Sequence, residues 1–535
     1  MAYNTSSPSP FAQRLVSLRV AMAGLRRTNI LYIIIFIILI IFFLPSTSHS
    51  LLSTSSFSSL SSTAGRPGTP VDVAAILTST PSGHAHYAWT EEDATKTDLG
   101  EGGLPFVTLN GGKPHFLRFD DKTIIDVITG KELQGANEGT TFNLAVLKLP
   151  RGSKWGFVGV ARGPTRRREF MAVKGNPSRE QVLVAFGLNI TSEGHLFAVT
   201  PGQTLDIPMA PKEGCISAGV WVATYGAEDP RLFWTDAGTP ALTIARYSDD
   251  ITTCRSVGFV ADLRDLYAPL DEALNPGDGV REYDSRRISG AGNNLELYKR
   301  DNQGPVEKNW VGFYPGAVPD GHSLYPHVQY AFVPSLALVP NTITPRRIIY
   351  DPIVLPTSLD TSNCIGDAHS AWEAKRIHQA SPLYRLTLCN RGKGCEAGTE
   401  NTVLFGLAHT KRGPSHYGKF IATFNVTYPH NVISVGPRFM MNDLNDDQIN
   451  YVLTMAPIVP SDLDPSIPPP SYKGGQQYLP NHFFLDDRIL FTLGHEDIKM
   501  VSVLADLKEV LGRQRICTVA GSGKSLFDHT HQHHH

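Results

Sequence analysis

The sequence predicts an all-β protein, a β-propeller of about five blades that follows a single N-terminal transmembrane helix. Short strand-like runs such as KWGFVGVAR, TVLFGLAHT and KMVSVLADL fill the chain after residue 71, and turn residues separate them. Helical periodicity is scarce, and LRDLYAPLDEAL and VLADLKEVLGR are the clearest helix candidates. The strands are too many for one sandwich, whereas four-stranded blades around an axis accommodate them. Two packed β domains are the alternative.

The N-terminal segment predicts an uncleaved signal anchor. Residues 30–44 are all apolar, and as a helix they would cover about 22 Å, short of the roughly 30 Å hydrocarbon core. Arginines are the only charged residues in the preceding segment 1–29, which predicts a cytoplasmic N-terminus. No clear small-residue cleavage site follows residue 44, which disfavours a cleaved signal peptide.

This topology predicts the domain order and the compartment. We expect a cytoplasmic tail at 1–29, the anchor at 30–44, a Ser/Thr/Pro-rich stem at 45–70 and a luminal catalytic domain at 71–535. The short span suits the thinner membranes of the early secretory pathway. The sequence therefore predicts a single-pass type II protein of the Golgi or another secretory membrane.

A luminal location changes what the cysteines and asparagines indicate. The six cysteines predict disulfides, with free buried thiols as the alternative, and Cys389 and Cys395 are close enough to form a small loop. Asn189 and Asn425 begin Asn-x-Thr glycosylation signals. The net charge of -2 gives no reason to expect a nucleic-acid partner.

The stretch GAEDPRLFW places Glu228, Asp229 and Arg231 beside a proline, between two runs that read as strands. A surface turn with a solvated ion pair is the simpler interpretation. However, GHEDIKM repeats the Gly-x-Glu-Asp pattern and places Asp497 in the same position relative to its strands. In a propeller the starts of the innermost strands meet at the central funnel, so the two motifs are expected to lie together.

Further polar clusters follow the same layout, and their residue types suit sugar chemistry. Paired carboxylates act as acid or base, and Arg or Lys binds a phosphate leaving group. Tryptophans can stack on sugar rings, although core packing is their commoner role. Pairs such as Asp249–Asp250 are interpreted as surface turns, so no metal site is assigned and a need for Mn²⁺ is left open. The candidates outside the two motifs are Glu307, Lys308, Asn309, Trp310, His327, Asp367, His409, Lys411 and Arg412.

These motifs carry a family resemblance. EDPRLF resembles the signature of the five-bladed β-mannoside phosphorylases of glycoside hydrolase family 130. With EKNW, PHVQY, LAHTK and GHEDIKM in order, the chain is more similar to the fungal β-1,2-mannosyltransferases of glycosyltransferase family 91. The shared motifs lie between Trp221 and Val503. VGFYPG after EKNW and GPSHYGKF after LAHTKR depart from the family pattern, which puts the acceptor and the linkage in doubt.

The resemblance implies a type II membrane enzyme that adds β-linked mannose from GDP-mannose to mannan, glycoprotein or glycolipid acceptors during cell-wall synthesis. Asp229 or Glu228 would be the base, with Asp367 and Asp497 as further candidates. A glycoside hydrolase or phosphorylase on the same scaffold is the first alternative, and a non-catalytic glycan-binding propeller is the second. The implied cations for the departing GDP are Arg231, Lys308, His327, Lys411 and Arg412; the other substrate contacts are Glu307, Asn309, Trp310 and His409.

Overall fold

The chain divides into two units, Met1–Gly65 and Arg66–His535, and all described residues lie in the second. The predicted anchor and stem lie outside the described residues, as do Glu307, Lys308 and Asp367. In the part of the chain that is described, no helix is long and apolar enough to cross a membrane. The computed structural model describes residues 106–109, 113–117, 123–133, 141–173, 176–207, 224–248, 255–275, 295–300, 309–315, 325–331, 336–344, 346–352, 377–391, 395–399, 401–412, 416–427, 430, 432–441, 443–444, 448–470, 480–511 and 514–516.

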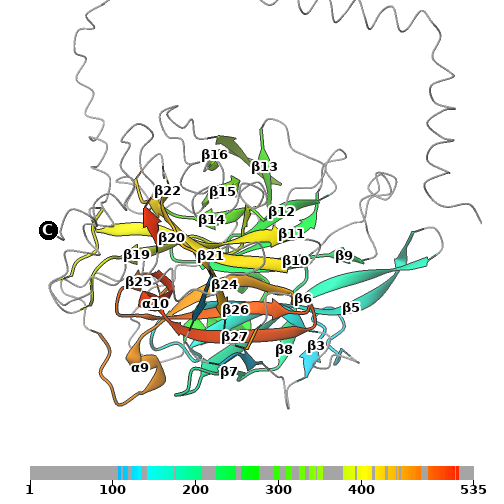
Figure 1. Ribbon diagram of the computed structural model, residues 1–535. Helices are drawn as coiled ribbons and strands as arrows, with labels where there is room; N and C mark the ends of the chain where they lie inside the picture. Colours follow the sequence, from blue (N-terminus) through cyan, green and yellow to red (C-terminus); the bar gives the residue numbers. More distant parts are fainter. Residues whose placement is uncertain are drawn as a thin grey trace, which may run out of the picture. The chain divides into compact units, whose positions relative to one another are not determined.

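The described part consists mainly of β-strands with a few short helices, which confirms the all-β prediction (Figure 1). The first sheet has seven strands: β3 (Ile124–Ile125), β4 (Phe142–Lys148), β5 (Phe157–Val173), β6 (Asn176–Ile190), β7 (Leu196–Ala198), β8 (Gly202–Thr204) and β9 (Thr224–Gly226). The second sheet has eight: β10 (Glu228–Trp234), β11 (Pro240–Tyr247), β12 (Arg255–Val260), β13 (Leu295–Lys299), β14 (Val311–Phe313), β15 (His327–Ala331), β16 (Leu336–Ile343) and β17 (Arg347–Pro352).

The other two sheets contain strands from both ends of the described chain. The third has nine strands: β1 (Phe106–Leu109), β18 (Ile377–Gln379), β19 (Tyr384–Thr387), β20 (Thr402–Arg412), β21 (His416–Asn425), β22 (Val432–Val435), β23 (Arg438–Met441), β25 (Phe483–Phe484) and β28 (Arg515–Ile516). The fourth has four: β2 (His115–Phe116), β24 (Asn450–Ile458), β26 (Arg488–His495) and β27 (Lys499–Asp506).

Antiparallel neighbours in chain order form most of each sheet. β10 to β13 pair successively, as do β14 to β17, and a parallel pairing of β13 with β17 joins these two meanders into one sheet. In the fourth sheet, β24, β26 and β27 pair in turn, and β2 from the start of the described chain pairs antiparallel with β27. Strands from the two ends of the described chain thus share one sheet.

The few helices are short. LRDLYAPLDEAL forms a 3₁₀ turn at Leu263–Asp265 and helix α6 at Pro269–Leu274, where proline suits the first turn. VLADLKEVLGR is helical only at α10 (Leu507–Leu511), because the strand ladder of β27 with β26 continues as far as Asp506. Here tertiary pairing overrides the local helical pattern. The segment that follows β24 begins with the short helix α9 (Pro460–Leu463).

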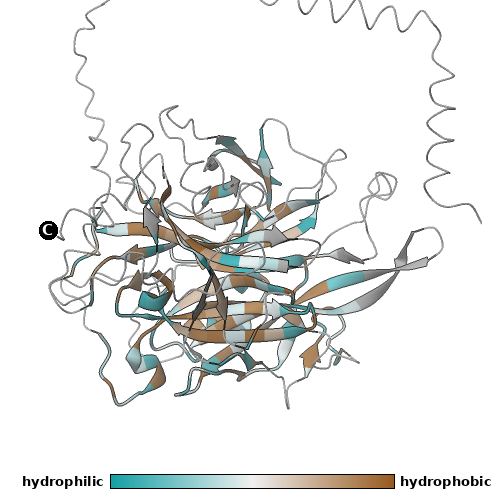
Figure 2. Cartoon of the chain, in the orientation of Figure 1, coloured by the Kyte–Doolittle hydropathy of each residue, from teal (hydrophilic) through white to brown (hydrophobic). Residues whose placement is uncertain are grey.

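The core lies between the sheets. One buried apolar cluster joins β19 to β21 of the third sheet with β24, β26 and β27 of the fourth, and another joins β4, β5, β10 and β11 with β24. Apolar residues accordingly follow the packed strands in Figure 2. Removing such surface from water is the main stabilising contribution to the fold. Because β4, β10 and β24 pack against one another, residues far apart in the sequence come together where these strands begin.

Candidate functional site

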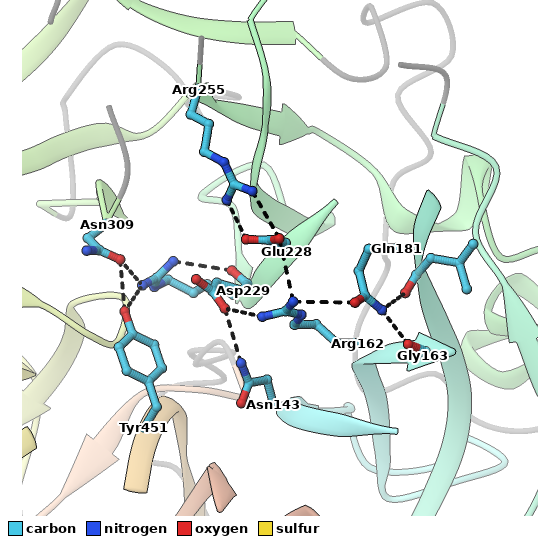
Figure 3. A network of polar contacts seen from close by, with 11 residues as sticks. Asn143, Arg162, Gly163, Gln181, Glu228, Asp229, Arg255, Asn309 and Tyr451 are labelled. Atoms are coloured by element: carbon cyan, nitrogen blue, oxygen red, sulfur yellow. Dashed lines mark hydrogen bonds and ion pairs between the residues drawn. The ribbon is translucent and has the colours of Figure 1, made fainter. Parts of the chain in front are cut away.

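Residues at the starts of five strands from all four sheets meet in one polar site, and Figure 3 shows those from the first, second and fourth sheets. Asn143 lies in β4, Asp229 in β10, Asn309 just before β14, His378 in β18 and Tyr451 in β24. The Asn143 Nδ2 donates to Asp229 Oδ1 at 3.1 Å, and the Tyr451 hydroxyl donates to Asn309 Oδ1 at 2.8 Å. The His378 and Tyr451 rings stack at 6.2 Å between centroids. We call these residues, together with Arg162, Glu228, Arg255 and Asp497, the Asp229 site.

The backbone is unusual at the same positions. Among the described residues, seven non-glycine residues have positive φ, and five of them belong to or flank this site. These are Asn143 (55°), Asp229 (49°), Asn309 (64°), Glu496 (56°) and Asp497 (53°). Left-handed conformations cost energy for residues with a Cβ, and such outliers cluster at functional sites. The backbone therefore marks the site independently of its side chains.

Irregular strand pairing sets the direction of the side chains of Asn143 and Asp229. The register shifts between Phe142 and Ala145 on β4 and between Glu228 and Arg231 on β10. Bulges of this kind redirect side chains and are common beside active sites. Pro230 lies within the second bulge, where the missing N–H of proline is tolerated. The proline among three charges therefore belongs to the bulge at the start of β10, and not to a solvated surface turn.

Glu228 is held by two arginines. The Arg255 guanidinium donates twice to its carboxylate, once at 3.1 Å, and Arg162 Nη2 lies 3.5 Å from Glu228 Oε1. Burial alone would lower the pKa of Arg255, but the hydrogen bond and charge of Glu228 outweigh it and raise that pKa. Bidentate pairing of this kind fixes both side chains. Glu228 thus anchors Arg255 and Arg162.

Asp229 contacts an amide and an arginine. Besides the bond from Asn143, Arg162 Nη1 lies 3.7 Å from Asp229 Oδ1, beyond hydrogen-bond distance. Its side chain is 17% exposed. Arg162 also donates to Gln181 Oε1 at 3.3 Å, and its buried Nε has no hydrogen-bond partner. Asp229 and Arg162 are thus close enough to act on one ligand and are not locked into one ion pair.

Asp497 faces the same group from the turn between β26 and β27. Its pKa is raised, first by desolvation and then by the charges of Asp229 and Glu228, while Arg162 and a hydrogen bond with Asn143 act in the opposite direction. The residue as a whole is exposed, which limits its desolvation, so the charges of the neighbouring carboxylates contribute to the raised pKa of Asp497. The structure therefore brings together the two Gly-x-Glu-Asp motifs.

Arg231 does not have the geometry expected of a leaving-group contact. The residue is only 2% exposed. Its Nε donates to the Ala380 carbonyl at 2.6 Å, its Nη1 to the Asp229 carbonyl at 3.2 Å, and its Nη2 to Asn309 Oδ1 and the Tyr451 hydroxyl at 3.2 and 3.0 Å. These bonds engage most of the guanidinium donors. Arg231 therefore cross-links the strands beneath Asp229, which corrects the role expected from its charge.

Aromatic rings form another side of the site. His378, His409, Tyr417 and Tyr451 come from β18, β20, β21 and β24 and contact one another in pairs. His409 is fully buried, and burial holds its pKa well below the usual range. Burial likewise raises the pKa of Tyr451. We call these four residues the aromatic wall.

Two other sequence candidates lie apart from this group. Trp310 is buried in the core with Phe233 and Phe259, which leaves no ring face for a sugar. His327 packs edge-on against Phe313 and His430, and burial, followed by the nearby His430, lowers its pKa to about 4. Of Lys411 and Arg412 only the backbone is described, in β20.

Several residues of the site and the aromatic wall escaped the sequence analysis, namely Asn143, Arg162, Arg255, His378, Tyr417 and Tyr451. The one local signal was a polar Asn143 inside the apolar run TFNLAVLKL. Arg162 and Arg255 stand at strand positions that sequence cannot distinguish from solvated charges. Their contacts span many residues of chain and depend on sheet register and bulges.

The cysteine and sequon predictions have different outcomes. A disulfide joins Cys389 to Cys395, which confirms the small loop expected from their spacing. Asn189 Oδ1 accepts a hydrogen bond from the Gly156 N–H at 2.7 Å. Asn425 is 8% exposed and its Oδ1 accepts from the N–H and hydroxyl of Thr427. Glycosylation at both asparagines stays a prediction.

Within the described residues, no group of three or more His, Cys, Asp or Glu is arranged to hold a metal ion.

A separate cavity lies where β10 ends. It is small, and Trp234, Tyr314, Tyr384 and His482 are among the residues that line it. Arg385 in its wall is paired with Asp236 at 2.7 Å. None of its lining residues belongs to the Asp229 site. We therefore assign the function to the Asp229 site at the start of β10, and not to this cavity.

Comparison with known proteins gives only distant likenesses. No protein-family model matches the chain, and no curated protein sequence does. The mannose phosphorylase MPT-4 of Leishmania mexicana is similar over 80% of this chain and 94% of its own, at 8% identity and TM-score 0.29. The GDP-Man-dependent mannosyltransferase MPT-1 of that organism is similar over 78% and 94%, at 10% identity and TM-score 0.27. A sialidase of Trypanosoma rangeli is similar over 75% and 60%, at 8% identity and TM-score 0.31. These values are too low to decide the reaction, which we argue from the site.

Proposed function

We propose that the protein is an inverting glycosyltransferase that adds β-1,2-linked mannose from GDP-mannose to mannan-type acceptors on glycoproteins or glycolipids, for cell-wall glycan synthesis. The carrying observation is the carboxylate pair Asp229 and Asp497, which Asn143 connects beside Arg162 on a strained backbone. Carboxylates, an amide and a guanidinium supply both proton transfer and hydrogen bonds to sugar hydroxyls.

Asp229 is the proposed base. Glu228 is paired with Arg255 and lies close to Arg162, whereas Asp229 accepts a hydrogen bond from the neutral amide of Asn143 and stays partly exposed. The acceptor hydroxyl attacks the anomeric carbon on the face opposite the diphosphate, and Asp229 takes its proton. A new carbon–oxygen bond forms as the bond from the anomeric carbon to the phosphate oxygen breaks, and GDP departs with that electron pair. An α-linked donor then gives a β-linked product.

Asp497 and Arg162 are proposed to hold the transferred mannose. Desolvation, followed by the charges of Asp229 and Glu228, raises the pKa of Asp497, and we propose that its carboxyl group forms hydrogen bonds with the hydroxyl groups of the transferred mannose. Arg162 has donor capacity left after its bond to Gln181. Lys308, Lys411 and Arg412 stay the proposed cations for GDP, since Arg231 is engaged elsewhere.

We extend the proposal to the architecture and the membrane. Four-stranded meanders and five convergent strand starts support a five-bladed propeller, in which β2 would complete the last blade. The apolar segment 30–44 supports a type II anchor with the catalytic unit in the lumen of the Golgi or another secretory compartment. A β-mannoside phosphorylase or hydrolase would use the same carboxylates and is the alternative that the test must separate.

The full-length protein should be incubated with GDP-mannose and a mannan oligosaccharide, with and without Mn²⁺, and in parallel with inorganic phosphate. Mass spectrometry and linkage analysis then identify the products. Growth of the acceptor by one β-1,2-linked hexose is the expected result. Shortened β-mannosides with mannose phosphate or free mannose would replace the transferase by a phosphorylase or a hydrolase. If the protein reacts neither with GDP-mannose nor with phosphate, the transferase, the phosphorylase and the hydrolase are all contradicted.

A further inference from the structure

Gln181 in β6 is a buried, neutral residue at the edge of the Asp229 site. It is 5% exposed, and its Oε1 accepts a hydrogen bond from Arg162 Nη2 at 3.3 Å (Figure 3). Its Nε2 donates to the Gly163 carbonyl and, at 3.5 Å, to the Val182 carbonyl. The opposite orientation of the amide would place its NH₂ group against the guanidinium and its oxygen against two carbonyls. Gln181 therefore presents an acceptor to Arg162.

The backbone around Gln181 is fixed by the strands on both of its sides. The register of β5 and β6 shifts between Arg162 and Thr165, and the Gly163 carbonyl that accepts from Gln181 lies within this irregularity. On the other side, β6 pairs with β9, where Gln181 is opposite Gly226. Gly226 has a φ of 130°, and a Cβ there would come within 2.1 Å of the Gln181 carbonyl oxygen. A glycine at this position therefore allows β9 to approach Gln181 closely.

Arg162 is oriented by contacts on its face and on its edge. Its guanidinium carbon lies 4.6 Å from the centre of the Phe142 ring. On the edge, Nη2 donates to Gln181 and lies 3.5 Å from Glu228 Oε1, while Nη1 lies 3.7 Å from Asp229 Oδ1. Among the described residues, the bond to Gln181 is the shortest polar contact of this guanidinium. Because the guanidinium is planar, a contact on its face and a bond at Nη2 together set the direction of Nη1.

Gln181 orients Arg162 without neutralising its charge. A carboxylate in this place would form an ion pair with the guanidinium, as Glu228 does with Arg255. A neutral amide accepts one hydrogen bond and keeps the positive charge of Arg162 beside the Asp229 carboxylate. Such an arrangement suits a cation that must meet both a carboxylate and a polar ligand.

We propose that Gln181 is a positioning residue for the reaction: its side-chain amide holds Arg162 so that Nη1 faces Asp229 and the mannose that is transferred. This inference rests on the proposed function, because it takes Arg162 to contact that mannose. Gln181 is buried and acts through Arg162. A misplacement of about 1 Å can slow an enzyme by about a hundred-fold, so the effect is expected in kcat.

A double-mutant cycle tests whether Gln181 acts through Arg162. Gln181→Met replaces the amide by an apolar chain of similar size, and Arg162→Met removes the guanidinium. In the wild-type background, Gln181→Met should lower kcat by about ten- to a hundred-fold. The acceptor KM should stay within about two-fold, because Arg162 is assigned to the transferred sugar. In the Arg162→Met background, Gln181→Met should lower kcat by less than about two-fold, since the group that it positions is already absent.

Gln514→Met is the matched control. Gln514 is also 5% exposed, and it accepts a hydrogen bond from the Ser434 hydroxyl at 3.0 Å, beside the pairing of β22 with β28 and outside the Asp229 site. Both glutamine changes remove buried hydrogen bonds and should lower the melting temperature. Only Gln181→Met should lower the kcat of the folded protein.

Two results would overturn the inference: a wild-type kcat in folded Gln181→Met, or losses from Gln181→Met and Arg162→Met that multiply in the double variant. The second result would show that Gln181 acts independently of Arg162. Should Gln181→Met not fold, Gln181→Asn decides, because it keeps an amide and shortens its reach. A wild-type kcat in Gln181→Asn would then overturn the inference.

Failure of the proposed function is seen on the wild type. The full-length protein is assayed with GDP-mannose and a mannan oligosaccharide, and separately with β-1,2-mannobiose with and without inorganic phosphate. Phosphorolysis or hydrolysis without transfer contradicts the transferase, and the same cycle on that rate still decides the role of Gln181. Transfer by the wild type with an equal kcat in Gln181→Met overturns the inference alone. A wild type without any of these activities overturns both.

Discussion

Arg231 shows how far a residue's role can depart from its charge. Its guanidinium donates hydrogen bonds to the Ala380 and Asp229 carbonyl groups and to the Asn309 and Tyr451 side chains, and the residue is buried. In the sequence, Arg231 lies two residues from Asp229, which suggests that both residues act on the substrate. The bulge on β10 and the packing of β14, β18 and β24 around it show instead that Arg231 cross-links strands.

We predict that Arg231→Lys destabilises the protein by about 3 kcal/mol, because one ammonium cannot replace a buried fork of donors and leaves acceptors unsatisfied. Urea unfolding measures this. Arg300→Lys is the control, since Arg300 is half-exposed and pairs with Asp351 at the surface, where ion pairs contribute little. An Arg231→Lys protein as stable as the wild type would show that the cross-link contributes nothing.

The β26–β27 hairpin shows strain at the scale of an element. Its turn is closed by the Ile498 N–H on the His495 carbonyl at 3.1 Å, and both central residues, Glu496 and Asp497, have positive φ. Such turns favour Asn and Gly, and a glutamate is costly there. This cost is understandable if the hairpin must hold Asp497 against Asp229.

Replacing Glu496 by Asn should therefore stabilise the protein by about 0.5–1 kcal/mol, because Asn tolerates the left-handed conformation better than Glu. Thermal and urea unfolding measure the change. The same replacement at Glu193, an exposed residue absent from the positive-φ set, should have no such effect. Loss of stability at position 496 would contradict the strain argument.

Gly494 joins that hairpin to the site. A Cβ at this position would come within 1.7 Å of Asn143 Oδ1. We expect Gly494→Ala to displace Asn143 and cost about 1–3 kcal/mol, as overpacking does, together with most of the activity. Gly156→Ala is the control, because its new Cβ would meet Asn189 Oδ1 at an ordinary 3.5 Å. Equal activity in the two variants would show that Asn143 does not position the carboxylates.

At the scale of the whole molecule, buried neutral histidines link stability to pH. Burial lowers the pKa of His327 to about 4 and holds those of His409 and His482 well below the usual value. A depressed folded-state pKa contributes stability that is present above the unfolded pKa of about 6.5 and is lost as the pH falls toward 4.

The free energy of unfolding should accordingly fall between about pH 6.5 and pH 4. His327→Gln should reduce that fall by up to about 3 kcal/mol, because one unit of pKa shift corresponds to roughly 1.4 kcal/mol. Urea unfolding at a series of pH values tests this. A wild-type stability that is flat over the window would contradict the account.

The sequence predicted the fold class because each strand is marked by a short contiguous stretch of sequence. Runs of β-branched and aromatic residues end at turn residues, as in β20 and β27. It also predicted that the two Gly-x-Glu-Asp motifs would meet, since that follows from repeated strand starts. It missed Asn143 and Arg162, whose contacts with Asp229 depend on register, bulges and left-handed backbone. Lys308 and Asp367 lie outside the described residues and stay predictions.

The most direct test of the central claim is the rate of mannose transfer by Asp229→Asn. Asparagine tolerates the φ of 49° at this position, so the backbone should be kept while the base is lost. We predict normal melting, retained mannobiose binding and a fall in kcat of at least about a hundred-fold. A folded Asp229→Asn protein that transfers mannose at the wild-type rate would contradict the account, because the base would then lie elsewhere.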